Sequence, residues 1–162
     1  MTASSDVTEQ TRIDWLLERF LTRVPETVAA LLTSPDGLLQ ANAHFTEEQA
    51  ETMAAIVSGQ YSLAGGATRV LDPHGQGAVR QIVVEHDAYV LFVMSAGAGL
   101  VPGQPAPAGE DPETVSTLLG VATTSEADAG LVGHEAALLA GALGEHLVIP
   151  TRRGSDDTQA TA

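Results

Sequence analysis

The sequence predicts an α+β domain in which a single five-stranded antiparallel sheet carries helices on both faces. Five short strand-like segments are joined mostly by tight turns, which is typical of antiparallel pairing. One of these segments, residues 88–96, is apolar on both of its sides, so we expect the sheet to be covered on both faces. Three segments with helical periodicity can supply the covering layers.

The composition is that of one acidic, folded domain. The chain has 162 residues, of which 44% are hydrophobic, so global disorder is not expected. Cysteine is absent, which excludes disulfides and thiolate metal sites. The 21 acidic and 7 basic residues give a formal charge of -14, which disfavours binding to nucleic acid or anionic membranes. This charge either keeps an apolar domain soluble or steers it toward a basic partner.

The termini predict a cytoplasmic protein without direct membrane insertion. The first ten residues lack the basic and apolar regions of a signal peptide, and no apolar run is long enough to span a bilayer. Recruitment to a membrane would have to go through partners. We expect the domain to occupy residues 11–149, with disordered tails over 1–10 and 150–162.

The first helix is predicted over 12–24, because apolar residues recur there at helical spacing and Pro25 stops the pattern. Trp15 lies off the apolar stripe, beside Arg19. An exposed tryptophan can mark a partner surface. Alternatively, Trp15 packs on a neighbouring element or under Arg19 as a cation–π pair.

The strands follow in two groups. Residues 27–33 and 38–43 form a hairpin around a Ser-Pro-Asp-Gly turn. Residues 79–85, 88–96 and 114–123 are the remaining strands. The Gly/Pro-rich stretch 97–113 is a flexible loop insertion between the last two.

A long helix over 46–71 is the central element. Thr46 and Gln49 have the spacing of a capping box. The two glycines at 65 and 66 could end the helix early, but the apolar period continues to Leu71. The stripe expected to face the sheet comprises Ala50, Met53, Ile56, Val57, Ala64, Ala67 and Leu71. Small residues lie nearly opposite, and form either a dimer interface that admits a second helix closely or a solvated face: Ala55, Gly59, Ser62 and Gly66.

The last helix is predicted over 126–148, and Pro150 stops it. Glu135 falls within its apolar arc, where it is either a satisfied buried carboxylate or, as we prefer, a residue at the edge of the arc.

Residue patterns typical of catalysis are not found in the sequence. The five histidines form no metal-binding pair on a helix, and there is no Gly-x-Ser-x-Gly elbow and no cysteine nucleophile. The expectation is therefore a protein that is not an enzyme and binds no metal or cofactor.

Several segments resemble the actinobacterial branch of the roadblock/LC7 family. They are Ile13-Asp14-Trp15-Leu16-Leu17, Val24-Pro25, Ser34-Pro35-Asp36-Gly37-Leu38, Val79-Arg80-Gln81-x-Val83-Val84-Glu85, Leu91-Phe92-Val93-Met94 and Gly130-Leu131-Val132-Gly133-x-Glu135. The resemblance covers about residues 11–149 and departs at 97–113, where relatives have a short turn.

This resemblance implies a fold with the long helix on one sheet face and two helices on the other, a layering similar to that of profilin. It also implies a homodimer formed through the long helix and an edge strand. The implied partners are a Ras-like small GTPase and a sensor histidine kinase-like protein.

Three functions remain open at this point. The first is a non-catalytic dimeric regulator that binds the GTPase and modulates its GTP cycle. The second is a structural scaffold that links the kinase-like sensor to other components without affecting GTP hydrolysis. The third is a small-molecule sensor, which no polar cluster in the sequence favours. If an arginine were supplied to a GTPase in trans, the candidates would be Arg12, Arg19, Arg23, Arg69 and Arg80.

Overall fold

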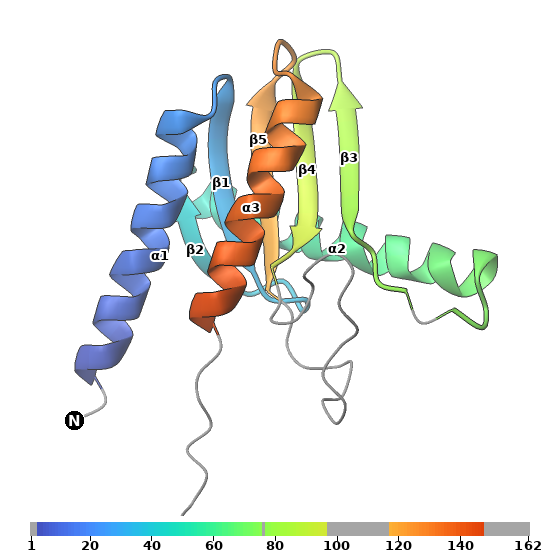
Figure 1. Ribbon diagram of the computed structural model, residues 1–162, viewed down its shortest axis with the longest axis horizontal. Helices are drawn as coiled ribbons and strands as arrows, with labels where there is room; N and C mark the ends of the chain where they lie inside the picture. Colours follow the sequence, from blue (N-terminus) through green and yellow to red (C-terminus); the bar gives the residue numbers. More distant parts are fainter. Residues whose placement is uncertain (1–2, 76, 97–116, 148–162) are drawn as a thin grey trace, which may run out of the picture.

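The structure is a computed structural model in which residues 3–75, 77–96 and 117–147 are described (Figure 1). Three helices and five strands make up this part of the chain. In order they are α1 Ala3–Arg23, β1 Thr27–Thr33, β2 Leu39–Ala43, α2 Glu47–Leu71, β3 Gln81–His86, β4 Tyr89–Ser95, β5 Leu118–Thr124 and α3 Ala129–Leu147.

The predicted fold class is confirmed. The strands form one sheet in the order β2-β1-β5-β4-β3, and every neighbouring pair is antiparallel. Helices α1 and α3 cover one face, and α2 crosses the other (Figure 1). The edge strands are β2 and β3.

Two apolar cores result from this layering. The larger lies under α1 and α3 and contains Leu17 of α1 and Leu143 of α3. The smaller lies under α2, where Val57 packs with Leu31 and Val93. Strand β4 contributes to both cores, because its alternate residues face opposite sides of the sheet. The prediction that this strand is apolar on both sides because both faces of the sheet are covered is therefore confirmed.

Helix α2 starts and ends as the sequence indicates, but it is rotated relative to the predicted stripe. Both hydrogen bonds of the capping box are present: Gln49 N–H donates to Thr46 Oγ1 at 3.3 Å, and Thr46 N–H donates to Gln49 Oε1 at 3.1 Å. The fully buried positions are Ala50, Ala54 and Val57. Ala54 was not in the predicted stripe.

The C-terminal part of the predicted stripe was wrong. Because of the rotation, Ile56 in the N-terminal half of the helix is 42% exposed. In the C-terminal half, Leu71 is 83% exposed and Ala67 is also exposed. The reason is geometric: the N-terminal half of α2 lies on the sheet, whereas its C-terminal half projects beyond β3 (Figure 1). A periodic stripe cannot be buried where no sheet lies beneath it.

Helix α1 begins at Ala3, so the predicted helix start near Arg12 was wrong. The Gln10 side chain explains part of the extension. Its Nε2 donates to Asp14 Oδ1 one turn along at 3.1 Å, and to the carbonyl oxygen of Gln40 in β2 at 3.3 Å. The second contact joins residues far apart in sequence, so no local pattern reveals it.

The remaining strand and helix boundaries differ from the predicted ones by a few residues. Strand β2 begins at Leu39, β3 spans Gln81–His86, and β5 spans Leu118–Thr124. Helix α3 begins at Ala129, after the predicted start at 126. The predicted loop 97–113, residues 114–116 of the predicted last strand and the predicted tail 150–162 lie outside the described residues.

Candidate interaction surfaces

The predicted small-residue face of α2, comprising Ala55, Gly59, Ser62 and Gly66, lies opposite the side that packs on the sheet. The first three residues are exposed and Gly66 is half-buried. A Cβ built on Gly59 would meet no atom within 4 Å. The backbone at Gly59 is therefore open to close approach by a second helix.

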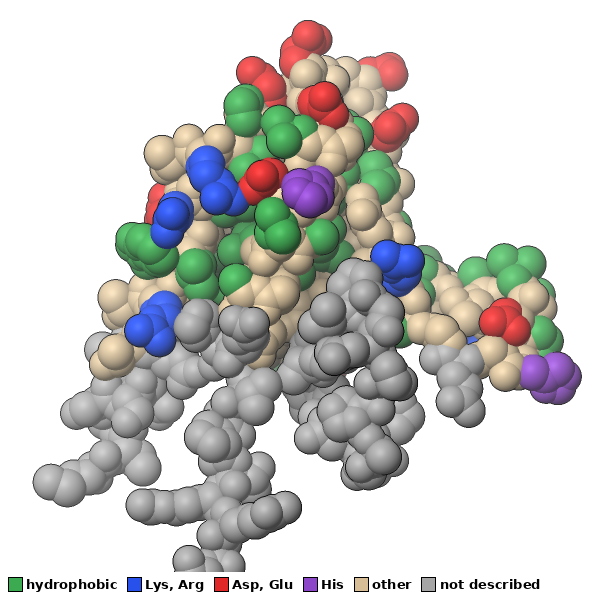
Figure 2. Space-filling view, in the orientation of Figure 1, with side chains coloured by type: hydrophobic (Ala, Val, Ile, Leu, Met, Phe, Trp, Pro, Cys, Tyr) green, Lys and Arg blue, Asp and Glu red, His purple; other side chains and the backbone are tan. Residues whose placement is uncertain are grey.

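An exposed apolar stripe adjoins these small residues, and the sequence reasoning missed it. Ile56 is 42% exposed, and Leu63 and Val70 are each 78% exposed. Because they recur one heptad apart, they share one side of the helix. The seven-residue repeat is the sequence signal that could have revealed this stripe, but the predicted pattern places Ile56 on the sheet-facing side. Figure 2 shows hydrophobic side chains on the projecting end of α2, at the right of the view.

Strand β3 lies at the sheet edge past which the C-terminal half of α2 projects (Figure 1). It pairs with β4 along its whole length, from Gln81 with Met94 to His86 with Tyr89. Val83 of this strand is 41% exposed. An edge strand of this kind can pair with another strand.

The predicted partner surface at Trp15 and Arg19 lies on the outer side of α1. Trp15 is 54% exposed, and Arg19 Cζ lies 5.1 Å from the centroid of its ring. The cation–π alternative is thus confirmed, and the tryptophan is exposed as well. Most of the basic side chains visible in Figure 2 lie over α1, while acidic side chains gather at one end of the sheet.

Helix α3 continues this surface. Arg23 of α1 forms a salt bridge with Glu135, whose side chain is 22% exposed, so Glu135 lies at the edge of the apolar arc as preferred. A small hollow at this junction is lined by Arg23, Val24, Pro25, Leu131 and Glu135. Leu138, on the same helix, is 55% exposed.

The candidate arginines are not brought together at one site. Arg12, Arg19, Arg23, Arg69 and Arg80 are all exposed. The first three lie on α1, Arg69 lies in the last turn of α2, and Arg80 precedes β3. No feature of their surroundings singles out one arginine as a residue that would act on a GTPase.

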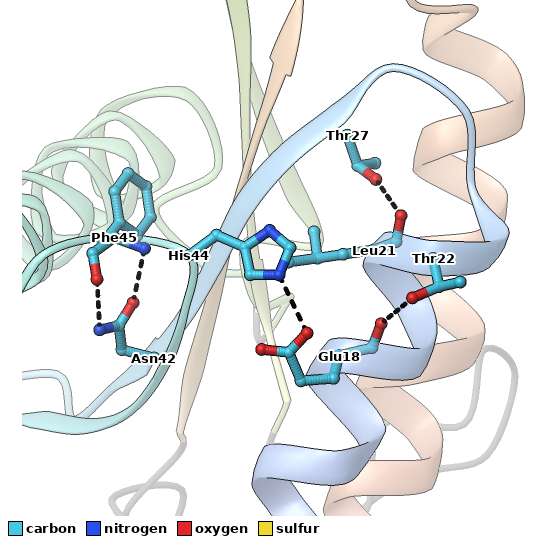
Figure 3. A network of polar contacts seen from close by, with 7 residues as sticks. All are labelled: Glu18, Leu21, Thr22, Thr27, Asn42, His44 and Phe45. Carbon is cyan, nitrogen blue, oxygen red and sulfur yellow. Dashed lines mark hydrogen bonds and ion pairs between the residues drawn. The ribbon is translucent and has the colours of Figure 1, made fainter.

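A polar network links α1 to the loop between β2 and α2 (Figure 3). His44 Nε2 lies 2.9 Å from Glu18 Oε2, and both side chains are about half exposed. Asn42 holds the loop: its Oδ1 accepts from Phe45 N–H at 3.1 Å, and its Nδ2 donates to the Phe45 carbonyl at 2.9 Å. Among the described residues, no cluster of three or more His, Cys, Asp or Glu side chains could hold a metal ion. No helix in that part of the chain is long and apolar enough to cross a membrane.

Comparisons with known proteins agree with this architecture. Residues 13–101, more than half of the chain, match the Roadblock/LC7 domain, and the chain belongs to that family. A Roadblock/LC7 domain from Streptomyces avermitilis is 36% identical, with a TM-score of 0.67 over 84% of this chain and 98% of that one.

More distant structures share the fold. The gliding protein MglB from Thermus thermophilus is 19% identical, with a TM-score of 0.66 over 85% of this chain and 90% of that one. MglB from Myxococcus xanthus is 16% identical, with a TM-score of 0.64 over 83% of this chain and 94% of that one. A search of curated proteins finds no match.

Proposed function

We propose that the protein is a non-catalytic dimeric regulator that binds a Ras-like small GTPase and modulates its GTP cycle within a bacterial signalling complex. The observation that carries this proposal is the exposed face of α2 in a Roadblock/LC7 domain. This face combines open glycine backbone with the apolar side chains of Ile56, Leu63 and Val70. Such a face suits a protein surface more than a substrate.

The homodimer would form through this face of α2 and the free edge of β3. Ala55, Gly59, Ser62 and Gly66 would let two helices approach, and the apolar stripe would be removed from water. Two β3 edges would extend the sheet across the subunits. One MglB structure of the same fold is described with a tetrameric arrangement, which is compatible with association through this kind of domain.

The GTPase would be recruited elsewhere, and Trp15 with Arg19 is the candidate surface. Aromatic and arginine side chains are enriched among residues that dominate binding energy. Trp15 is already held by Arg19, so little side-chain entropy would be lost on binding.

The decisive experiment measures single-turnover GTP hydrolysis and nucleotide exchange by a purified Ras-like small GTPase from the same organism, with and without the purified chain. We expect a change in one of these rates that saturates with added protein. Unchanged rates combined with no binding in a pull-down would refute the proposal.

The alternative is a structural scaffold that links a sensor histidine kinase-like protein to other components and leaves hydrolysis unaffected. The same exposed faces support it. Capture of the sensor's cytoplasmic region, with no capture of the GTPase, would favour the scaffold. We further propose that the protein is cytoplasmic and is recruited to the membrane through such a sensor.

A further inference from the structure

The open edge of the sheet at the start of β1 borders a groove that the proposed function does not use. We propose that this groove binds an extended segment of a partner protein. The segment pairs with the free edge of β1 and directs an apolar and a basic side chain into the groove.

Within the part of the chain that the structure describes, this edge is left without a paired strand because β2 is shorter than β1. Their pairing ends at Ala30 with Ala43, which leaves Thr27, Val28 and Ala29 beyond the ladder on that side. His44 then turns the chain away with a φ of 70°, a conformation that non-glycine residues rarely adopt. The two hydrogen bonds between Asn42 and Phe45 fix this departure (Figure 3).

A β-bulge directs side chains from this edge into the groove. The register of β1 with β5 shifts between Thr27 and Ala29. A bulge puts two residues of one strand opposite one residue of its partner, and it can re-aim a side chain. Val28 and Ala29 are consecutive in the strand, yet both line the groove. Val28 is left 51% exposed although it is β-branched and apolar.

The groove has a volume of about 450 Å³, which is within the range of ligand sites. Its apolar surface comes from Val28, Phe45 and Met53. Its polar rim comes from the N-terminal turns of α2 and from the preceding loop. The rim residues are His44, Glu48, Gln49 and Thr52.

The acidic charge of the groove and of the whole chain favours a basic partner segment. Glu48 is exposed, lines the groove and forms none of the salt bridges found among the described residues. The whole chain carries a formal charge of -14, so its field favours a cationic segment at this rim. Because side chains of a strand alternate, an apolar residue and a basic residue two positions apart would both face the groove.

The groove is separate from the proposed dimer interface. None of the small residues Ala55, Gly59, Ser62 and Gly66 lines it, and β3 lies at the opposite edge of the sheet. The inference does not depend on the GTPase proposal, and each can fail without the other.

The test uses a short fluorescein-labelled peptide in which valine and arginine alternate with threonine, so that one face of the strand presents both. Binding to the full chain is followed by fluorescence anisotropy. Two control peptides replace the arginines with glutamate, or the central threonine with proline, which cannot donate a ladder hydrogen bond. We expect the arginine peptide to bind and each control to bind at least about tenfold more weakly.

Two matched variants locate the site. Glu47 and Glu48 lie in the same first turn of α2, but only Glu48 lines the groove. Both Glu47→Lys and Glu48→Lys lose the same favourable interaction with the helix dipole. Glu48→Lys alone should reduce peptide affinity, and amide NMR shifts should concentrate at residues 27–29 and 44–53.

Three results would overturn the inference. One is no binding of the arginine peptide at millimolar concentration. Another is an equal loss of affinity in the two lysine variants, which would indicate a general charge effect. The third is binding that tolerates the proline, which would indicate a side-chain pocket for another class of ligand and no strand pairing.

Discussion

Val57 of α2 lies directly over Gly120 of β5. A Cβ built on Gly120 would be 2.8 Å from Val57 Cγ2 and 3.5 Å from Leu31 Cγ. Val57 and Leu31 are both fully buried, so moving either side chain would disturb the packing between α2 and the sheet. The absence of a side chain at Gly120 therefore fixes how closely α2 approaches the sheet.

We predict that Gly120→Ala destabilises the domain by about 1–3 kcal/mol, the usual cost of an overpacked core. Urea unfolding followed by circular dichroism measures this change. The variant Val57→Ala removes the group that the new methyl would meet. The double variant should lose less unfolding free energy than the sum of the losses in the two single variants. Strict additivity would show that the two residues do not constrain each other.

The capping box of α2 gives a second prediction. Thr46→Ala removes the hydroxyl that accepts from Gln49 N–H, and should cost about 1 kcal/mol of unfolding free energy. Thr46→Asp keeps an acceptor at the same position and should retain most of the stability. If Thr46→Ala unfolds at the same urea concentration as the parent chain, the cap contributes no measurable stability.

The contact between Val57 and Gly120 also explains which part of α2 the sequence could not predict. Its length, its cap and its small-residue face follow from local spacing. Its rotation depends on where Gly120 lets the helix come close, and its overhang depends on the width of the sheet. Both are long-range properties, so Ile56 was assigned to the buried side although it is exposed.

The same distinction applies to the other elements. Strand β4 was predictable because a run that is apolar on both sides requires a covered sheet. The early part of α1 was not, because Gln10 reaches across to Gln40 in β2. Of the candidate interaction residues, Trp15 and Gly59 were recognisable from helical position alone. The groove beside Val28 required the bulge and the early end of β2, which leave no local signature.

Gly59 allows the proposed dimer to be tested without damage to the monomer. Gly59→Leu should weaken self-association, because bulk is placed where two helices would approach. A Cβ there meets nothing within 4 Å in the monomer. Leucine is also the better helix former, so we expect the folded chain to be stabilised by about 0.5–1 kcal/mol. Light scattering and urea unfolding separate these two effects.

Gly65→Leu is the matched control. Gly65 is in the same helix, is also free of contacts at its Cβ position, and does not belong to the small-residue face. The control should gain helix stability and keep the mass of the parent chain. An unaltered mass for both variants would place the interface elsewhere.

Trp15 gives a direct optical test of the proposed partner surface, since it is the one tryptophan in the sequence. At 54% exposure its emission should lie at long wavelength and be quenched readily by acrylamide. Contact with a GTPase at this surface should shift the emission to shorter wavelength and reduce quenching, because the indole leaves water. Trp15→Ala should change stability by no more than about 0.5 kcal/mol, as expected for a surface residue, yet weaken binding by about tenfold or more. Leu138→Ala, at an exposed position on α3, tests how far the surface extends. An emission spectrum unaffected by a partner that demonstrably binds would exclude Trp15 from the contact.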